Sequence, residues 1–378
     1  MKGRRVGIVL VAIVGVWLLS LFFRARGPAE SHLVGTRSAG AVKSDPAAGR
    51  RALPAHKPRE LNTSDTAPPR LLVSNNEMQV PTGLRLMVFT PHPDDETLAA
   101  GGLIQRVLAK EGKVEVVFMT NGDGFRDAVI YEVGRLQTST SDFIEYGEQR
   151  HDEAIQAMNG LGLGPEGSVF LGFPDGGIDD LWADNWSRGA PYTSPFTHFD
   201  RPLYKESLTK KLQYSGANLV EEMSRLLTDF EPDWVVLPDP RDKHPDHYTA
   251  GLFVLDALRK LKQERADCVA NTQVFTYLIH FPDYPTLTGW TKRVKTAGLG
   301  GVGATCVALS STQWLNLPIT TEELEGKRDA LTAYKSQIIM MGGFFELFLH
   351  SYEIFGKLDA EQIMIVPRVY AAQSRLGN

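Results

Sequence analysis

Short apolar runs alternate with helix-like segments along the middle of the chain. The runs LRLMVFT (84–90), VEVVFMT (114–120) and WVVL (234–237) are continuous, as in strands that are buried on both faces. Between them, apolar residues recur every three or four positions, as in a helix with one buried side. These segments are residues 97–110, 150–161, 219–230 and 248–261. The alternation predicts right-handed βαβ units, and therefore an α/β fold with a Rossmann-like, mostly parallel sheet and helices on both faces.

Three shorter apolar runs predict further strands, at residues 168–171, 274–279 and 305–309. Residues 321–337 predict a helix with Thr320 or Thr321 as its N-cap, because threonine is a favoured cap and acidic residues follow it. In such folds, ligands bind where the carboxyl ends of the strands meet the following helices. We therefore expect the active site at that edge of the sheet.

Residues 176–214 have no apolar period and are rich in aromatic residues, Pro, Asn and Asp. A stretch of this kind inside an α/β domain is usually a functional loop rather than a linker. Trp182, Trp186 and Tyr192 of this predicted insertion either stack on a sugar ring or hold the loop against the domain. The sequence does not choose between these alternatives.

The N-terminal 80 residues divide into two unusual segments. Residues 6–23 carry no charge and have basic residues on both sides, which predicts a single transmembrane anchor or, alternatively, a cleaved signal peptide. Residues 24–80 contain no Phe, Tyr or Trp, which predicts a disordered, basic tether. Residues 81–378 then form one domain. We expect this domain on the extracytoplasmic side of a membrane, with a cytoplasm-facing or a secreted domain as the alternatives.

Charge changes sign between the N-terminal part and the rest. Residues 1–70 contain 12 lysines and arginines against 4 aspartates and glutamates, whereas residues 71–378 contain 28 against 41. An acidic domain does not suit phosphate neutralisation, so we expect no nucleic-acid partner. Two cysteines, Cys268 and Cys306, exclude a disulfide framework and a cysteine-based zinc site. No feature of the sequence indicates a protein partner.

Ionisable residues are concentrated directly after the first strand, in the sequence PHPDDE (91–96). His92, Asp94, Asp95 and Glu96 repel or perturb one another in a fold unless a cation lies among them. An N-cap role for one aspartate is the structural alternative. It accounts for one carboxylate and not for the group.

A second cluster follows the WVVL run, in the sequence PDPRDKHPDH (238–247). If both strands belong to one parallel sheet, the two turns lie at the same edge. His92, His244 and His247 then meet several carboxylates. Two histidines and an aspartate are a common set of three ligands for a catalytic zinc, which keeps a fourth position open.

HPDDE after the first strand, together with HPDH after a later one, resembles the motifs of the PIG-L/LmbE-like de-N-acetylase superfamily. This superfamily includes deacetylases of glycosylphosphatidylinositol synthesis and of the mycothiol and bacillithiol pathways. The resemblance extends over residues 84–340. The other segments that carry it are VVFMTNGDG (116–124), Arg150 with Glu153, LGFPDGG (171–177), and Lys327 with YKSQ (334–337).

The resemblance implies a role for each residue of the two turns. His92, Asp95 and His247 are expected to bind Zn²⁺, or Fe²⁺ as the alternative. Asp94 is expected to be the general base, and His244 an acid or a stabiliser of the oxyanion. This agrees with the chemistry, because a carboxylate next to a metal ligand can accept a proton from water.

Four further residues have two interpretations each. Arg150 contacts substrate, as the resemblance implies, or pairs with Glu153 on the helix surface. Asn121 and Asp123 meet sugar hydroxyls or hold their loop. Asp246 orients an imidazole from behind the metal ligands or caps a helix.

The sequence therefore predicts a metal-dependent hydrolase that removes the N-acetyl group of an N-acetylglucosamine-type sugar in a glycoconjugate or polysaccharide. The expected partners are this sugar and, through residues 6–23, a membrane. One alternative is a zinc amidase that acts on another amide, such as a thiol-sugar conjugate. A second alternative is a carbohydrate-binding module without catalysis.

Overall fold

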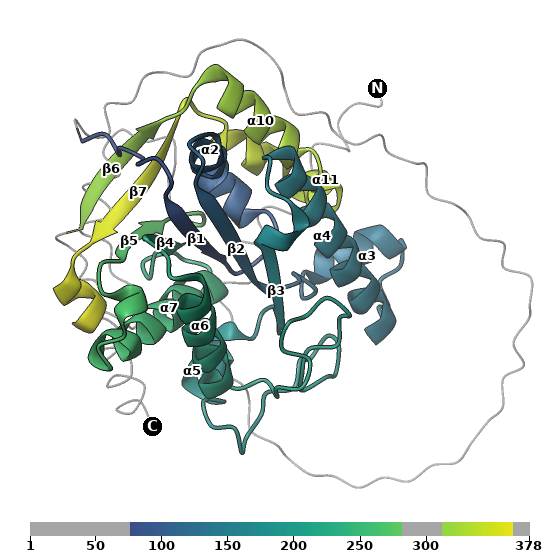
Figure 1. Ribbon diagram of the computed structural model, residues 1–378. Coiled ribbons are helices and arrows are strands. Elements are labelled where there is room, and N and C mark those ends of the chain that lie inside the picture. Colours follow the sequence, from purple (N-terminus) through teal and green to yellow (C-terminus); the bar gives the residue numbers. More distant parts are fainter. Residues whose placement is uncertain (1–75, 282–311, 366–378) are drawn as a thin grey trace, which may run out of the picture. The chain divides into compact units, whose positions relative to one another are not determined.

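The computed structural model describes residues 76–281 and 312–365, which contain a central mixed sheet (Figure 1). The order of its strands is β3-β2-β1-β4-β5-β7-β6. The strands are β1 (Arg85–Thr90), β2 (Lys113–Thr120), β3 (Ser168–Phe173), β4 (Trp234–Pro238), β5 (Gln273–Tyr277), β6 (Gln313–Pro318) and β7 (Tyr352–Leu358). The first five are parallel, whereas β7 is antiparallel to both β5 and β6. The predicted mostly parallel α/β fold is thus confirmed.

The strand order reverses at β1. From β1 the chain proceeds outward to β2 and β3, and then returns to place β4 on the other side of β1. Loops that leave the carboxyl ends of β1 and β4 therefore go to opposite faces of the sheet. In α/β folds, ligands bind where the strand order reverses in this way.

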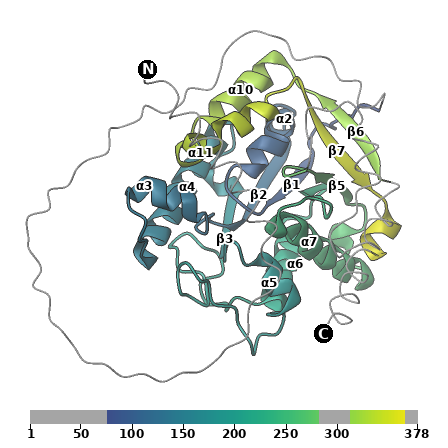
Figure 2. The ribbon, with the colours of Figure 1, turned by 180° about the vertical axis from the view of Figure 1, so that it is seen from behind.

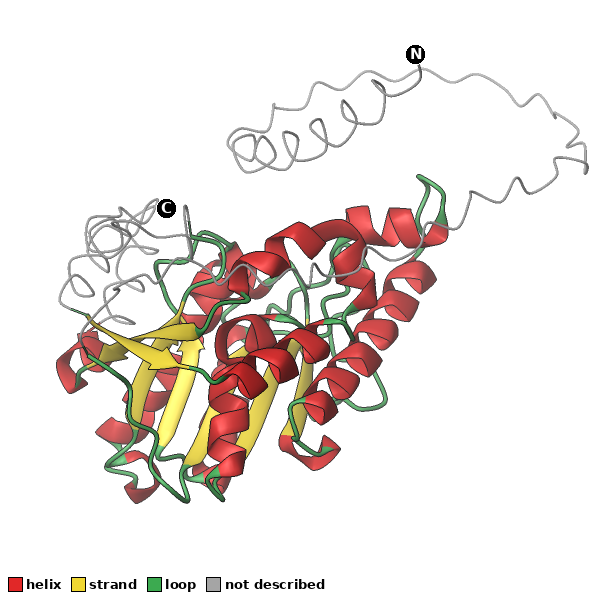
Figure 3. Cartoon of the chain, turned by 90° about the horizontal axis from the view of Figure 1, so that it is seen from above, coloured by secondary structure: helices red, strands yellow, loops and turns green. Residues whose placement is uncertain are grey.

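Helices cover both faces of the sheet, as Figures 2 and 3 show. One face carries α2 (Asp95–Ala109), α4 (Thr140–Gly160) and α10 (Thr321–Leu331), and the other carries α5 (Ile178–Ala183), α6 (Gly216–Phe230) and α7 (Pro245–Gln263). Two further helices are α3 (Arg126–Val133) and α11 (Lys335–Phe345), and the short 3₁₀ turns are Pro165–Gly167, Asp267–Val269 and Glu346–Phe348.

Both faces of the sheet are apolar because successive strand residues point to opposite sides. In β1, Val88 packs with the α2 side, whereas its neighbour Phe89 packs with the α7 side. In β2, Phe118 packs with the α2 side and Val117 packs with the α7 side. The continuous apolar runs of the sequence therefore mark strands that are covered on both faces.

Helix α2 is kinked at Ala100, whose φ and ψ are −136° and 15°. The kink leaves backbone groups unpaired within the helix, and two residues from elsewhere satisfy them. Lys327 Nζ donates to the carbonyl oxygen of Leu98 (2.8 Å), while Glu353 accepts from the amides of Gly102 (2.7 Å) and Leu103 (2.9 Å). Lys327 and Glu353 also pair with each other at 2.8 Å in the interior. This cluster fixes the first turns of α2, which follow the HPDDE sequence.

The predicted helix at 321–337 is two helices, α10 and α11, separated by residues 332–334. Thr320 is the N-cap of the first, and its hydroxyl accepts from Glu323 N. The break occurs because the Tyr334 side chain is directed into the interior, where its hydroxyl donates to Glu96. Strands β6 and β7 lie on one side of the sheet beyond the parallel strands and were not predicted. The predicted strand at 305–309 lies outside the described residues.

The predicted membrane-anchored localisation is corrected by the structure. Within residues 76–281 and 312–365, no helix is both long and apolar enough to cross a bilayer. Helix α4, for example, has the length but exposes Glu145, Glu148 and Asp152. The prediction of a domain held at a membrane is therefore wrong for this part of the chain. The predicted span, residues 6–23, lies outside the described residues.

The predicted tether extends to residue 80, but residues 76–80 lie against the sheet. Met78 N donates to the carbonyl oxygen of Asn316 in β6 at 2.8 Å. The side chains of Met78 and Val80 are buried in the apolar core. The rest of the predicted tether lies outside the described residues, and the division of the chain into segments stays a prediction.

Candidate active site

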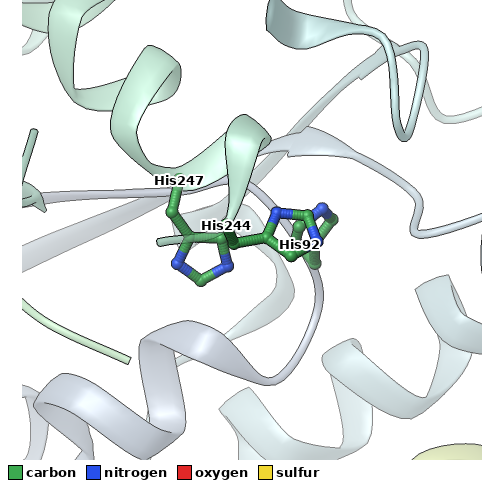
Figure 4. A group of neighbouring side chains, drawn as sticks. All are labelled: His92, His244 and His247. Carbon is green, nitrogen blue, oxygen red and sulfur yellow. The ribbon is translucent and has the colours of Figure 1, made fainter. Parts of the chain in front are cut away.

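The two histidine-containing turns meet at the carboxyl ends of neighbouring strands. His92 follows β1, whereas His244 and His247 lie at the start of α7, after β4, and Figure 4 shows their rings grouped together. The ring centroid of His92 is 5.0 Å from that of His244 and 5.2 Å from that of His247. Convergence follows from strand order, because β1 and β4 are paired and parallel.

Asp95 lies between two of these histidines. Its Oδ2 atom is 3.1 Å from His92 Nδ1 and 3.1 Å from His247 Nε2. Burial acts to raise the pKa of Asp95, but the neighbouring imidazoles of His247 and His92 outweigh it, and its pKa lies well below the ordinary value. The three residues predicted as metal ligands therefore present an ionised carboxylate and two imidazoles at one point.

The histidines retain capacity for a further ligand. His247 is buried, and its nitrogens face carboxylate oxygens of Asp95 (3.1 Å) and Asp242 (3.7 Å) without an aligned hydrogen bond within the residues that the structure describes. His244 Nδ1 also has no hydrogen bond within the described residues. Ligand atoms of His92, His244 and His247 lie within 4.8 Å of one another, as do those of Asp95, His247 and His280. Buried polar atoms normally have partners, so this donor set fits a divalent cation, and nitrogen with carboxylate donors suits zinc or iron.

His92 faces a second pair of carboxylates with its other nitrogen. His92 Nε2 is 3.1 Å from Asp175 Oδ1 and 3.2 Å from Asp246 Oδ2. Burial opposes protonation of His92, but the charge of Asp175 and hydrogen bonds to Asp175, Asp246 and Asp95 raise its pKa well above the ordinary value. Asp246 also accepts from the amides of Gly176 (2.7 Å) and Ile178 (3.1 Å). The structure thus places Asp246 against the His92 imidazole, on the side away from Asp95.

Asp94 adopts a strained backbone conformation at the start of α2, with φ of 118°. Its side chain does not cap the helix. Instead, its Oδ2 atom accepts from Arg150 Nη2 at 3.1 Å. Burial raises the pKa of Asp94, Arg150 lowers it, and the charges of Asp95 and Glu96 raise it further, so that its pKa lies well above the ordinary value. A carboxylate with a raised pKa suits proton transfer near neutral pH.

Arg150 is buried and contacts protein oxygens with both terminal nitrogens. Nη1 donates to the carbonyl oxygen of Gly122 at 3.0 Å, and Nη2 donates to that of Pro93 as well as to Asp94. Gly122 has φ of 68°, and a Cβ atom there would lie 2.0 Å from Arg150 Nη1, so only glycine fits. Glu153 is not the surface partner of Arg150, because it accepts from the amide and hydroxyl of Ser336. Contact between Arg150 and substrate stays a prediction.

Asn121 and Asp123 are both buried beside this arrangement. Asn121 Nδ2 donates to the carbonyl oxygen of Gly147 at 3.4 Å, and its Oδ1 has no hydrogen bond within the described residues. Asp123 accepts from the hydroxyl of Tyr204 at 2.5 Å. Burial and the charge of Asp175 raise the pKa of Asp123 to about 7. Asp123 therefore ties the 176–214 loop to the sheet.

The aromatic residues of the 176–214 loop mainly hold the loop in place. Trp182, Tyr204 and Tyr214 are buried, and the Tyr214 hydroxyl donates to the carbonyl oxygen of Gly172 at 2.9 Å. Trp186 is partly exposed and stacks on Phe253, with ring centroids 5.9 Å apart. Of the two alternatives for this loop, the structure favours packing against the domain for these rings.

Three residues at the site were not predicted from the sequence. Asp175 follows β3 within LGFPDGG, so its position after a strand was a signal. Asp242 Oδ2 lies 3.7 Å from His247 Nδ1 and accepts from the amides of Ile279 and His280. His280 follows β5, and its ring centroid lies 4.8 Å from that of His247. Burial and neighbouring histidines lower the pKa of His280 to about 4.

Comparison with known proteins agrees with the geometry. Residues 87–258 match the family model "PIG-L: GlcNAc-PI de-N-acetylase". The 1D-myo-inositol 2-acetamido-2-deoxy-alpha-D-glucopyranoside deacetylase of Nocardia farcinica is 29% identical over 275 residues, which cover 69% of this chain and 82% of that protein. The enzyme of the same name from Mycobacteroides abscessus is 28% identical over 184 residues, 47% of this chain and 57% of its own length. Residues 87–258 thus belong to the PIG-L/LmbE de-N-acetylase superfamily.

Solved structures of similar proteins include the N,N'-diacetylchitobiose deacetylase of Pyrococcus horikoshii. It is 17% identical, with a TM-score of 0.43, over 72% of this chain and 83% of that one. The zinc-inhibited form of the teicoplanin deacetylase Orf2 is 15% identical, with a TM-score of 0.44, over 73% of this chain and 99% of that one.

Proposed function

We propose that the protein hydrolyses the N-acetyl group of an N-acetylglucosamine-type sugar, with release of acetate and a free amine. The observation that carries the proposal is Asp95 between the imidazoles of His92 and His247, with Asp94 beside it on Arg150. Membership of the superfamily supports the same reaction, since the relatives in Nocardia farcinica and Mycobacteroides abscessus are named as deacetylases of a 2-acetamido sugar.

The residues that would hold a metal are His92, Asp95 and His247, with Zn²⁺ or Fe²⁺ as the ion. A bound cation of this kind lowers the pKa of water to about 7 and polarises a carbonyl group. The protein's own contribution is to keep Asp95 ionised and to fix the His92 ring. Asp175 and Asp246 contact the second nitrogen of His92, an arrangement that orients an imidazole and sets its tautomer.

Asp94 would move the proton in the reaction. Arg150 holds its Oδ2 atom, and the strained backbone directs the carboxylate away from the end of α2. Hydrolysis adds the oxygen of water to the acetyl carbon and breaks the carbon–nitrogen bond. The proton that leaves the water is held on Asp94 and then passes to the departing nitrogen, which becomes the amine.

His244 would stabilise the negative charge that develops on the acetyl oxygen. Burial, followed by the neighbouring His247, His92 and His280, lowers the pKa of His244 well below the ordinary value. The lowered pKa favours a neutral imidazole that donates a hydrogen bond from one nitrogen, so of the two roles that the sequence left open, acid or oxyanion stabiliser, we propose the second. A neutral donor aimed at a developing oxyanion is sufficient for this role.

The test is acetate release by the full chain, loaded with Zn²⁺ or Fe²⁺, from a panel of N-acetylated amino sugars and thiol-sugar conjugates. We expect acetate and amine in equal amounts from at least one N-acetyl sugar, with activity removed by a chelator and restored by the metal. Hydrolysis of thiol-sugar conjugates alone would favour the amidase alternative. Sugar binding without acetate release from any compound would contradict the proposal and favour the binding module.

A further inference from the structure

A cavity of about 240 Å³ lies between the 176–214 loop and the segment that begins α4. Its walls include Arg126 at the start of α3, Thr138 and Thr140 around the start of α4, and Phe196 and His198 of the loop. None of these residues belongs to the candidate metal centre. We call this space the Arg126 cavity.

Phe196 of the Arg126 cavity packs on backbone that is bonded to a residue of the metal centre. A Cβ atom would lie 3.0 Å from Cε2 of Phe196 if built on Gly124 and 3.5 Å if built on Gly176, so Phe196 packs on the backbone at these two glycines, the second of which follows Asp175. Gly124 N also donates to Asp175 Oδ2 at 2.6 Å. The other oxygen of Asp175 is 3.1 Å from His92 Nε2. One chain of contacts thus joins Phe196 of the cavity, through Gly124 and Asp175, to His92 of the centre.

The loop side of the cavity is held in a defined conformation by Ser194, which is buried. The Ser194 hydroxyl accepts from the amides of Phe196 and Thr197, both at 3.3 Å, and its carbonyl oxygen accepts from His198 N at 2.9 Å. His198 has φ of 61°, a left-handed conformation that this hydrogen bonding maintains. The aromatic wall is thus a built surface of the fold.

The chemistry of the walls suits a sugar ring. The rings of Phe196 and Phe143 lie 5.2 Å apart at an angle of 43° and form an apolar surface. The hydroxyls of Thr138 and Thr140 have no hydrogen bond within the described residues, which leaves them for a ligand. Pockets that enclose drug-sized ligands have volumes of about 300–1,000 Å³. The Arg126 cavity is smaller than this, so it suits a single sugar ring.

The charge at the cavity favours an acidic sugar. The guanidinium of Arg126 is exposed and has no ion pair within the part of the chain that the structure describes. Asp142, the nearby carboxylate at the start of α4, is already bound by Arg135 Nη2 at 2.6 and 2.7 Å. A guanidinium matches the two oxygens of a carboxylate, and one such group balances one negative charge.

We infer that the Arg126 cavity is a subsite for a second sugar residue of the substrate, and that this residue carries a carboxylate. The inference rests on the proposed function, because the first sugar must occupy the metal centre for the second to reach the cavity. It narrows the substrate to an N-acetylated sugar that is linked to an acidic one, as in a uronic-acid-containing glycan.

The experiment compares three substrates with the metal-loaded full chain. These are N-acetylglucosamine, N,N′-diacetylchitobiose, and a disaccharide of glucuronic acid and N-acetylglucosamine. Acetate release is measured for the wild type, for Arg126→Gln, and for Arg225→Gln as a matched control, since Arg225 is an exposed arginine on α6.

We expect the wild type to prefer the acidic disaccharide over the neutral one by about tenfold in kcat/KM, the effect of one charge-assisted hydrogen-bonded contact. Arg126→Gln should abolish this preference through KM, whereas Arg225→Gln should keep it. Equal kcat/KM values for the two disaccharides, or a preference that Arg126→Gln retains, would overturn the inference while leaving the proposed function in place. Absence of acetate from all three substrates would also overturn the inference, whereas the proposed function is decided by the full panel of N-acetylated sugars.

Discussion

Two groups of buried charges lie along α2, and they differ in how their polar atoms are used. At the kink, Lys327 and Glu353 satisfy each other and the free backbone groups of the helix. At the start of the helix, Asp95 lies between two imidazoles, and the nitrogens of His247 face carboxylates without an aligned hydrogen bond within the described residues. The first group is complete, so it stabilises the fold. The second is incomplete, which indicates a site for a ligand.

The largest effect is expected from breaking the complete group. Lys327→Met leaves Glu353 as an unpaired charge in the interior, which should lower the free energy of unfolding by about 3–5 kcal/mol. Chemical denaturation of the wild type and the variant measures this. Glu353→Gln tests the partner, and both variants should behave alike with or without added metal. A metal-dependent loss of stability would contradict the division between the two groups.

Replacement of Asp94 should affect turnover rather than the fold. Asp94→Asn keeps the shape and the contact with Arg150 but cannot accept a proton. We expect acetate release to fall about 1,000-fold, because general base catalysis typically contributes about 10²–10⁴-fold. Single-turnover kinetics with the metal-loaded variant measure the loss. Activity within tenfold of the wild type would show that another group accepts the proton.

A smaller effect is expected at His244, which would act through a hydrogen bond. His244→Ala should lower kcat about 100-fold, as expected for loss of one oxyanion donor. His244→Gln retains an N–H donor and should lose less. If the two variants are equally impaired while each still binds metal, then His244 does not act by donating a hydrogen bond to the acetyl oxygen.

An effect that depends on pH is expected at Asp123, whose pKa is raised from 3.8 to about 7. Between these pH values the folded protein keeps a proton that the unfolded chain has released, so stability decreases as the pH rises. Asp123→Asn still accepts from Tyr204 but does not titrate. We expect the variant to lose less stability than the wild type between pH 4 and 8, by up to about 4 kcal/mol, since each unit of pKa shift corresponds to about 1.4 kcal/mol. Parallel stability curves would contradict the raised pKa.

The parts of the site that follow strands could be predicted from the sequence. His92, Asp95, His244 and His247 lie in short motifs after continuous apolar runs, and the parallel sheet brings such turns together. Asp175 also follows a strand, but it has no histidine beside it in the sequence, and its contact with His92 depends on the path of the loop after β3.

Two other features depend on tertiary contacts that no local pattern encodes. The direction of the Arg150 side chain follows from the approach of Gly122 and Pro93, which are distant in sequence. The break between α10 and α11 follows from the contact of Tyr334 with Glu96. In the sequence, both regions have the pattern of an ordinary amphipathic helix.

The central claim is that Asp95, and not its neighbour Asp94, binds a metal together with His92 and His247. Equilibrium dialysis against Zn²⁺, followed by measurement of metal content, tests it in the wild type, Asp94→Ala, Asp95→Ala and His280→Ala. We predict one ion per chain in the wild type, Asp94→Ala and His280→Ala, and loss of this ion in Asp95→Ala, with every variant folded by circular dichroism. Equal loss of metal in Asp94→Ala and Asp95→Ala, or a full ion in Asp95→Ala, would contradict the account.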